Sequence, residues 1–414
     1  MIRRIQNARR DALRSDRPKR VRRATAVQGA GDAPEKPGPL DGGIVAASAV
    51  LAGVGIVMVY SATAPLAMGR ALPPHFIRHL AAVFAGIVCI AVVVRVLIGV
   101  WRRFALPLWA LGTALLVWTL TAGIEANGAQ RWIALPGTGL RLQAAEFVKW
   151  ATVLAIAALC ARFVDRRGAA GKRAVVLAAA VMLPPSLLLL AQPDFGSAAV
   201  LAAIVGMLLF VAGVPFRHLL APVVVAGVGA AGYIATHPYA MARLRGFVDP
   251  WSRARQEGFQ LVQSFIAFGR GGVLGVGIGD GRQKLYYLPE AHTDFVLSVV
   301  AEELGLVGVL VVLGAFAALV VAGTRIAVRA REPFGQLLAF GMTALIAVPA
   351  VVNAAVVMGV VPTTGFTLPF ISFGANSLIM CSIAIGILLR IGSHDVRVSR
   401  RRIASASHRG LLRT

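Results

Sequence analysis

The sequence predicts an all-α fold: a polytopic membrane bundle of about ten transmembrane helices with one large extracytoplasmic loop. Of its 414 residues, 57% are hydrophobic and only 14% are charged, and the mean hydropathy is +0.75. A soluble domain of this size does not need so apolar a composition. Apolar runs of about 18 to 25 residues, the length that crosses a bilayer, recur along most of the chain between short polar breaks.

Each of the apolar runs is expected to form a helix. A lone strand edge cannot lie in lipid with its backbone groups unpaired, and the runs lack the two-residue alternation of strands. The expected spans are residues 43–64, 78–98, 104–122, 143–161, 174–191, 196–213, 216–236, 294–323, 334–358 and 370–391. The chain is thereby divided into a basic disordered tail (1–42), seven helices (43–236), a large extracytoplasmic loop (237–293), three helices (294–391) and a basic tail (392–414).

The basic residues place both termini on the cytoplasmic side. Lys and Arg collect in the two tails and in the loops after alternate spans, and short basic loops are retained in the cytoplasm. A multi-pass protein of the cytoplasmic (inner) membrane is therefore expected. The net charge of +24 is attributed to this topology and to anionic membrane lipids, and not to nucleic acid, because it lies in tails and short loops.

The loop 237–293 is the one long outward-facing segment. Its stretch "RQEGFQLVQSFIAFG" spaces Phe259, Val262 and Ile266 at helical intervals, which predicts an amphipathic helix at the membrane interface. The glycine run at 269–281 lacks the strand and helix of a nucleotide-binding unit. We interpret its glycines as supplying tight turns and close backbone approach, with contact to a ligand phosphate as the alternative.

Charged side chains gather near the outer ends of the predicted spans, at a depth suited to the headgroup of an outer-leaflet lipid. Glu146 and Lys149 are three residues apart on one helical face, so they form either a structural ion pair or part of a site. Asp194 either caps the sixth span or takes part in catalysis. Asp294 begins the eighth span and either caps it or takes part in catalysis, and Thr293 beside it is already available as a cap. Charge in a membrane span is costly, which makes these residues functional candidates.

The outer loop adds a histidine, an acid and several cations. His292 is either a proton shuttle or a solvated loop histidine, and Glu290 lies two residues before it. Arginine and lysine side chains bind the oxygens of a lipid diphosphate well. The loop supplies Arg243, Arg270 and Lys284 among its cations.

Several separated motifs together resemble one family. They are "NGAQRWIALPGTGLRLQAAEFVKW", "QPDFGSAAV", "GGVLGVGIGDGRQKLYYLPEAHTDF", "AEELGLVG" and "PTTGFTLPFISFGANSL", in order along the chain after "VMVYSAT". These motifs are similar to the SEDS proteins, FtsW and RodA, and "VYSAT", "LPEAHTDF" and "TLPFIS" are more similar to FtsW. The resemblance implies a ten-span peptidoglycan glycosyltransferase that polymerises lipid II at the outer face of the membrane for septal wall synthesis. It also implies a class B penicillin-binding protein as partner, beside other division or elongation proteins.

The resemblance further implies roles for individual residues. The family's catalytic aspartate maps onto Asp294 through "HTDF", and its polar residues of the fourth span map onto Glu146 and Lys149. The other expected substrate contacts are Arg131, Asp194, Arg243, Arg270, Lys284, Glu290, His292 and Ser372. Three departures bear on partner choice or substrate handling: "QAAE" replaces "QPSE", "SFGANS" replaces "SYGGSS", and His79 replaces a glutamine.

In the expected mechanism Asp294 is the general base on a sugar hydroxyl of the acceptor lipid, which attacks the anomeric carbon of the donor while undecaprenyl diphosphate leaves. Arginines of the outer loop, Lys149 or a divalent cation would neutralise the leaving diphosphate. The sequence specifies no metal site and no other cofactor. Three alternatives stay open: a lipid II flippase, an elongation polymerase of the RodA type, and a non-catalytic scaffold of the division machinery.

Overall fold

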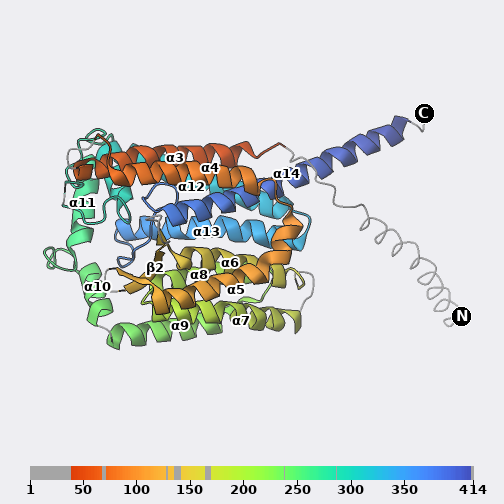
Figure 1. Ribbon diagram of the computed structural model, residues 1–414, viewed down its shortest axis with the longest axis horizontal. Helices are drawn as coiled ribbons and strands as arrows, with labels where there is room; N and C mark the ends of the chain where they lie inside the picture. The colour runs from red at the N-terminus through yellow and green to blue at the C-terminus, as the bar shows by residue number, and fades with distance from the viewer. Residues whose placement is uncertain are drawn as a thin grey trace, which may run out of the picture. The chain divides into compact units, whose positions relative to one another are not determined.

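The computed structural model describes residues 39–67, 71–126, 129–134, 141–163, 169–236, 238–285 and 287–411. Within them the protein is a bundle of long helices, and one helix corresponds to each expected span (Figure 1). These helices are α3 (Gly42–Thr63), α4 (Pro74–Val93), α5 (Ile98–Ala122), α6 (Ala144–Cys160), α7 (Ala169–Ala191), α8 (Phe195–Val211), α9 (Phe216–Thr236), α12 (Val296–Arg329), α13 (Pro333–Val357) and α14 (Ala375–Leu411). The predicted fold class is confirmed. Most of the expected N-terminal tail lies outside the described residues.

Seven helices of the described part are long and apolar enough to cross a membrane, which confirms a multi-pass membrane protein. They are α3 with a short extension to Ala67, α4, α5, α7 from Arg173, α12, α13, and α14 as far as Ser393. The prediction of about ten spans also includes α6, α8 and α9. Two of these three, α6 and α8, have only 17 residues each. A helix of this length is about 26 Å long, whereas the hydrocarbon core of a bilayer is roughly 30 Å thick. Nearly every residue of α6 is buried, so protein rather than lipid surrounds this helix.

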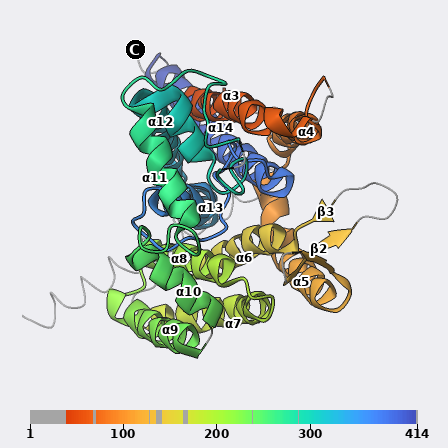
Figure 2. The same cartoon turned by 90° about the vertical axis from the view of Figure 1, so that its left-hand side faces the viewer.

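The core of the bundle is built around α6, which packs against α5, α7, α8 and α13. The N-terminal helix α3 packs against α12, and α4 packs against α14. Figure 2 shows α6 and α8 between α13 on one side and α7 and α9 on the other. Small residues allow this close packing: a Cβ at Gly341 of α13 would lie only 2.5 Å from Cγ1 of Val153 in α6.

The described residues of the predicted outer loop (237–293) contain two helices, α10 (Pro238–Val248) and α11 (Phe259–Gly271), at the end of the bundle opposite the one from which α14 projects (Figure 1). The amphipathic helix expected from Phe259, Val262 and Ile266 is α11. It packs against α12 and buries a face that includes Leu261 and Val262. The loop is therefore a folded cover on this end of the bundle.

A small antiparallel sheet lies between α5 and α6 in the chain. Its strands are β1 (Ile124–Ala126), β2 (Ala129–Ala134) and β3 (Arg141–Leu142), in the order β1-β2-β3. Trp132 pairs with Ile124, and Ile133 pairs with Leu142. This sheet, whose β2 strand carries Arg131, was not expected from the sequence pattern.

The glycine run of the outer loop folds over a break in α12. At Gly305 the backbone has a φ of 65°, which interrupts the helix. A carbonyl group near the break pairs with the run, where the N–H of Val276 donates to the carbonyl oxygen of Glu302 at 3.0 Å. A Cβ at Gly271 would overlap the carbonyl oxygen of Ala301. The close backbone approach predicted for these glycines is confirmed.

Candidate active site

Asp294 lies in a turn immediately before α12. The carbonyl oxygen of Glu290 accepts hydrogen bonds from the backbone N–H groups of Thr293 and Asp294, at 3.1 and 3.2 Å. Glu290 has a φ of 55°, a left-handed conformation that is uncommon outside glycine. Phe295 is the N-cap of α12, and no side chain caps this helix. The capping alternative for Asp294 is therefore wrong, because a different residue occupies the cap.

Helix α13 and the segment between α13 and α14 hold the Asp294 turn in place. The side-chain amide of Asn353 donates to the carbonyl oxygens of Asp294 and Phe366, at 2.7 and 2.6 Å. The hydroxyl of Ser372 donates to the carbonyl oxygen of Thr293. These hydrogen bonds use main-chain acceptors, so they fix the position of Asp294 without engaging its carboxylate.

The surroundings raise the pKa of the Asp294 carboxyl to about 7. Burial is the main cause, because it disfavours the charged form, and the negative charge of Glu290 adds to it. The guanidinium of Arg243 and a hydrogen bond with Thr293 act in the opposite direction and lower the pKa. Arg243 itself donates to the carbonyl oxygen of Thr363 at 3.0 Å. A carboxyl group that titrates near neutral pH is suited to general acid–base chemistry.

The Glu146–Lys149 pair is separated from Asp294 by one short stretch of backbone. Nζ of Lys149 lies 2.8 Å from Oε1 of Glu146, with the lysine side chain almost fully buried. The same Nζ lies 5.8 Å from the centre of the Phe366 ring. On the neighbouring residue, a Cβ at Gly365 would come 3.3 Å from Oδ2 of Asp294. The ion pair and the aspartate therefore share one wall, formed by residues 365 and 366.

Asp194 and Arg131 shape the turn before α8. Oδ1 of Asp194 accepts a hydrogen bond at 3.0 Å from the backbone N–H three residues further on and caps α8, as one of the two interpretations predicts. Arg131 donates to the carbonyl oxygen of Pro193 at 2.6 Å. A Cβ at Gly196 would lie 2.9 Å from Cζ of Phe366. This turn thus touches the same aromatic wall as Lys149.

His292 is packed rather than solvated. Its ring centre lies 5.3 Å from that of His75 and 5.8 Å from that of Phe373. Burial lowers the pKa of His292, the charge of Glu290 raises it, and His75 lowers it further. The net lowering favours a neutral imidazole at pH 7.

Arg270 and Lys284 belong to a second cluster, made of buried ion pairs, which links the outer loop to α12 and α3. Nη1 of Arg270 lies 2.6 Å from the buried carboxylate of Glu302. Nζ of Lys284 lies 2.6 Å from Oε1 of Glu303, which also accepts a hydrogen bond from the hydroxyl of Ser61 at 2.7 Å. Both cations are engaged with carboxylates there, and their expected role as substrate contacts stays a prediction.

Within the described residues, no three His, Cys, Asp or Glu side chains converge as metal ligands would. A divalent cation could still be held jointly by fewer side chains and by the oxygens of a substrate diphosphate. The carboxylates of Asp294 and Glu290 are the acidic groups of the turn, and hard cations bind oxygen ligands of this kind. The divalent cation stays a prediction.

The sequence patterns do not single out Asn353, Glu303 or Ser61. Asn353 offers a signal, since it is an amide near the end of an apolar span. Glu303 follows Glu302 directly, but its partner Ser61 is 242 residues away along the chain, and nothing local indicates that contact. Phe366, which forms part of the wall shared by Lys149 and Asp294, also cannot be told apart from a core aromatic residue by the sequence pattern.

Residues 43–397 match the FtsW/RodA/SpoVE family, described as cell cycle protein. A relative from Halomonas elongata, named probable peptidoglycan glycosyltransferase FtsW, is 40% identical over 383 residues, which cover 90% of this chain and 96% of the relative. The chain also matches a solved structure, described as "Structural coordination of polymerization and crosslinking by a peptidoglycan synthase complex". The TM-score is 0.71 and the identity is 29%, and the match covers 86% of this chain and 98% of that one. The rod shape determining protein RodA of Thermus thermophilus matches with a TM-score of 0.63 and 28% identity, covering 85% of this chain and 96% of that one.

Proposed function

Because the chain belongs to the FtsW/RodA/SpoVE family of cell cycle proteins, we propose that it is a peptidoglycan glycosyltransferase that polymerises lipid II for septal wall synthesis. The reaction takes place at the outer face of the cytoplasmic membrane, with both termini in the cytoplasm. One observation carries the proposal. The main chain of Asp294 is held in its turn by the side-chain amide of Asn353, and burial raises the pKa of the Asp294 carboxyl group to about 7.

Asp294 acts as the general base. Its carboxylate takes the proton from a sugar hydroxyl of the acceptor lipid, and the hydroxyl oxygen forms a bond to the anomeric carbon of the donor. The bond from that carbon to the diphosphate breaks, and undecaprenyl diphosphate leaves with inversion at the carbon. Positioned proton removal contributes about 10² to 10⁴ in rate. The remainder comes from orientation of the two lipids and from neutralisation of the leaving group.

Two cations are best placed to receive the diphosphate. Arg243 acts electrostatically on Asp294. Nζ of Lys149 lies 5.8 Å from the centre of the Phe366 ring, and the neighbouring Gly365 approaches the Asp294 carboxylate. Lys149 pairs with Glu146, whose side chain is 20% exposed, whereas Arg270 and Lys284 pair with fully buried carboxylates at 2.6 Å, which makes those two cations poorer candidates. A divalent cation is the remaining source of positive charge.

A transpeptidase partner fits the same proposal. The solved complex to which the chain is similar is described as coordinating polymerization and crosslinking. We therefore assign this chain a class B penicillin-binding protein as its partner. An elongation role of the RodA type stays the alternative process, since both branches share the family and the fold.

Purified full-length protein in vesicles with labelled lipid II tests the activity. Glycan ladders that increase when the candidate penicillin-binding partner is added are the expected product. Unmodified lipid II that appears in the opposite leaflet would identify a flippase instead. Absence of both products, with the partner present and folded, would favour a scaffold.

A further inference from the structure

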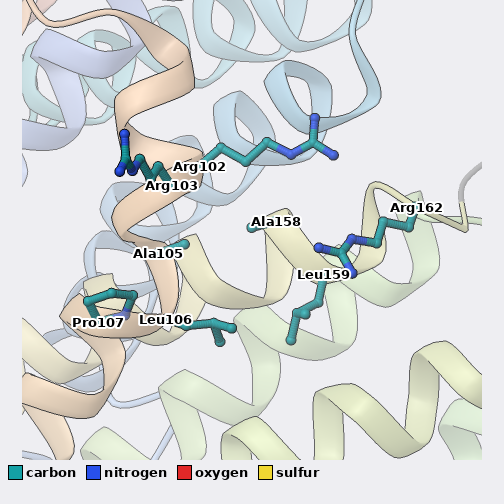
Figure 3. Close-up of a pocket in the computed structure, with 8 residues that line it drawn as sticks. All are labelled: Arg102, Arg103, Ala105, Leu106, Pro107, Ala158, Leu159 and Arg162. Carbon is teal, nitrogen blue, oxygen red and sulfur yellow. The ribbon is translucent and has the colours of Figure 1, made fainter.

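A cavity of about 320 Å³ lies between the start of α5 and the end of α6 (Figure 3). Three arginines line it: Arg102 and Arg103 from α5, and Arg162 from just beyond α6. Glu146, in the first turn of α6, belongs to the Asp294 site, whereas Arg162 follows the last turn of the same helix. The cavity is therefore at the opposite end of the bundle from the site of the proposed reaction.

Small side chains explain why space remains at this end. Ala105 and Ala158 line the cavity and are both buried. Further along the same helix pair the packing is tight, since a Cβ at Gly112 of α5 would lie 3.2 Å from Cα of Val148 in α6. Helices α5 and α6 are thus in close contact near Asp294's end of the bundle, and they leave a gap at the other end, where each helix contributes an alanine.

Within the described part of the chain, no ion pair compensates the positive charge around this gap. None of the four ion pairs among the described residues includes Arg102, Arg103 or Arg162, and no acidic side chain lines the cavity. The guanidinium of Arg102 lies 5.9 Å from the centre of the Phe334 ring, a stacking contact that leaves its charge in place. Figure 3 shows the Arg162 side chain pointing toward Ala158. Three like charges around one cavity repel each other until an anion binds.

The rest of the lining is apolar, which makes the cavity amphipathic. Leu106, Pro107 and Leu159 complete it, and Leu106 is 47% exposed on a helix that is long and apolar enough to span a membrane. A ligand that fills such a site has phosphate oxygens for the guanidinium groups and an alkyl chain for the leucines. Basic pockets between transmembrane helices on the cytoplasmic side bind anionic lipid headgroups in this way.

We propose that this cavity binds the phosphate headgroup of an anionic phospholipid from the cytoplasmic leaflet. The guanidinium group of Arg162 holds the phosphate, the positive charge of Arg103 adds electrostatic attraction, and the acyl chain runs along the exposed face of α5 beside Leu106. The site is separate from the proposed catalysis and does not depend on it.

Lipid titration of the full-length protein in zwitterionic micelles, read by native mass spectrometry, tests the proposal. The probes are short-chain phosphatidylglycerol, phosphatidylcholine and inorganic phosphate. The wild type is expected to bind phosphatidylglycerol and not phosphatidylcholine. The double variant Arg103→Gln/Arg162→Gln is expected to bind it about 30-fold more weakly, the factor for removing two basic residues at a membrane surface.

The matched control is Arg325→Gln/Arg329→Gln, which removes the same charge from two exposed positions near the end of α12. It should bind phosphatidylglycerol like the wild type. A second variant, Ala158→Leu, fills the cavity while keeping every arginine, and should also lose binding with its thermal unfolding midpoint near the wild-type value. Equal binding by the two double variants, or wild-type binding by a folded Ala158→Leu, would overturn the proposal. Phosphate binding as tight as that of phosphatidylglycerol would also overturn it, in favour of a free anion.

Discussion

Asn353, in the last two turns of α13, ties the main chain of Asp294 to the segment opposite it. Its Nδ2 lies 2.7 Å from the carbonyl oxygen of Asp294 and 2.6 Å from that of Phe366. One buried amide thus sets the distance between the proposed base and the aromatic wall beside Lys149. The position of the carboxylate depends on a residue of a different helix.

Asn353→Leu keeps the size of this side chain and removes both hydrogen bonds. Two carbonyl oxygens lose their donor, so unfolding should become easier by about 1 to 3 kcal/mol. Because the variant misplaces the base, kcat should fall more than KM rises. Asn376→Ala is the control, since it removes an exposed amide contact to Arg141 and should leave both quantities near wild type. Normal kcat in a folded Asn353→Leu would refute the positioning role.

The pH dependence of polymerisation reports on the Asp294 carboxyl. Only its ionised form accepts a proton, so the rate should rise with pH and level off above the pKa of about 7. Glu290→Gln removes a charge that raises this pKa, so the rising limb should move to lower pH. A limb that stays in place in Glu290→Gln, or a rate independent of pH, would contradict the assignment.

Much of the site was predictable because it depends on local patterns. The ten helices follow from apolar run length, and the Glu146–Lys149 pair follows from a spacing of three residues on one helical face. Asp194 as a helix cap and α11 as an amphipathic helix also follow from residues close in sequence. These features share one property: the residues that determine each of them lie in one continuous segment of the chain.

The remaining features depend on contacts distant in sequence. The break in α12 at Gly305 is stable because the glycine run pairs with the backbone near it, and neither segment alone reveals the other. The burial of Glu303 depends on Lys284 and on Ser61 of the first described helix. The limited length of α6 is tolerated because four other helices surround it.

Lys284→Met tests the buried cluster. Glu303 is fully buried beside Lys284, so removal of the lysine leaves a buried carboxylate without its cation. Such changes cost about 3 to 5 kcal/mol in the free energy of unfolding. The matched control is Arg253→Met, because Arg253 and Glu257 form an exposed pair at 3.9 Å, and it should cost at most about 1 kcal/mol. Chemical denaturation of the two variants distinguishes the cases, and equal losses would show that the buried pair is not structurally important.

Gly271→Ala tests the packing of the outer loop on α12. The added methyl group would overlap the carbonyl oxygen of Ala301, whereas a Cβ at Gly269, in the same helix, meets nothing within 4 Å. Gly271→Ala should therefore lower the thermal midpoint, and Gly269→Ala should hold or raise it, since alanine favours a helix by about 1 kcal/mol over glycine. The opposite order would show that α11 does not approach α12 this closely.

Asp294→Asn should also show that the ionised carboxylate of Asp294 lowers the stability of the folded protein. Its pKa in the folded protein is raised from 3.8 to about 7, so its ionisation disfavours the folded state as the pH rises between these values. The asparagine variant does not ionise. Its thermal midpoint relative to wild type should therefore increase from acidic to alkaline pH, and this comparison also establishes that the variant is folded.

The initial rate of lipid II polymerisation by purified Asp294→Asn, with the penicillin-binding partner present, decides whether this residue is the base. Asp280→Asn, which changes an exposed acid of the same outer loop, is the control and should retain the wild-type rate. We expect Asp294→Asn to lose a factor of at least about 10² with its fold intact. Glycan strands made by this variant at the wild-type rate would contradict the assignment of Asp294 as the catalytic residue.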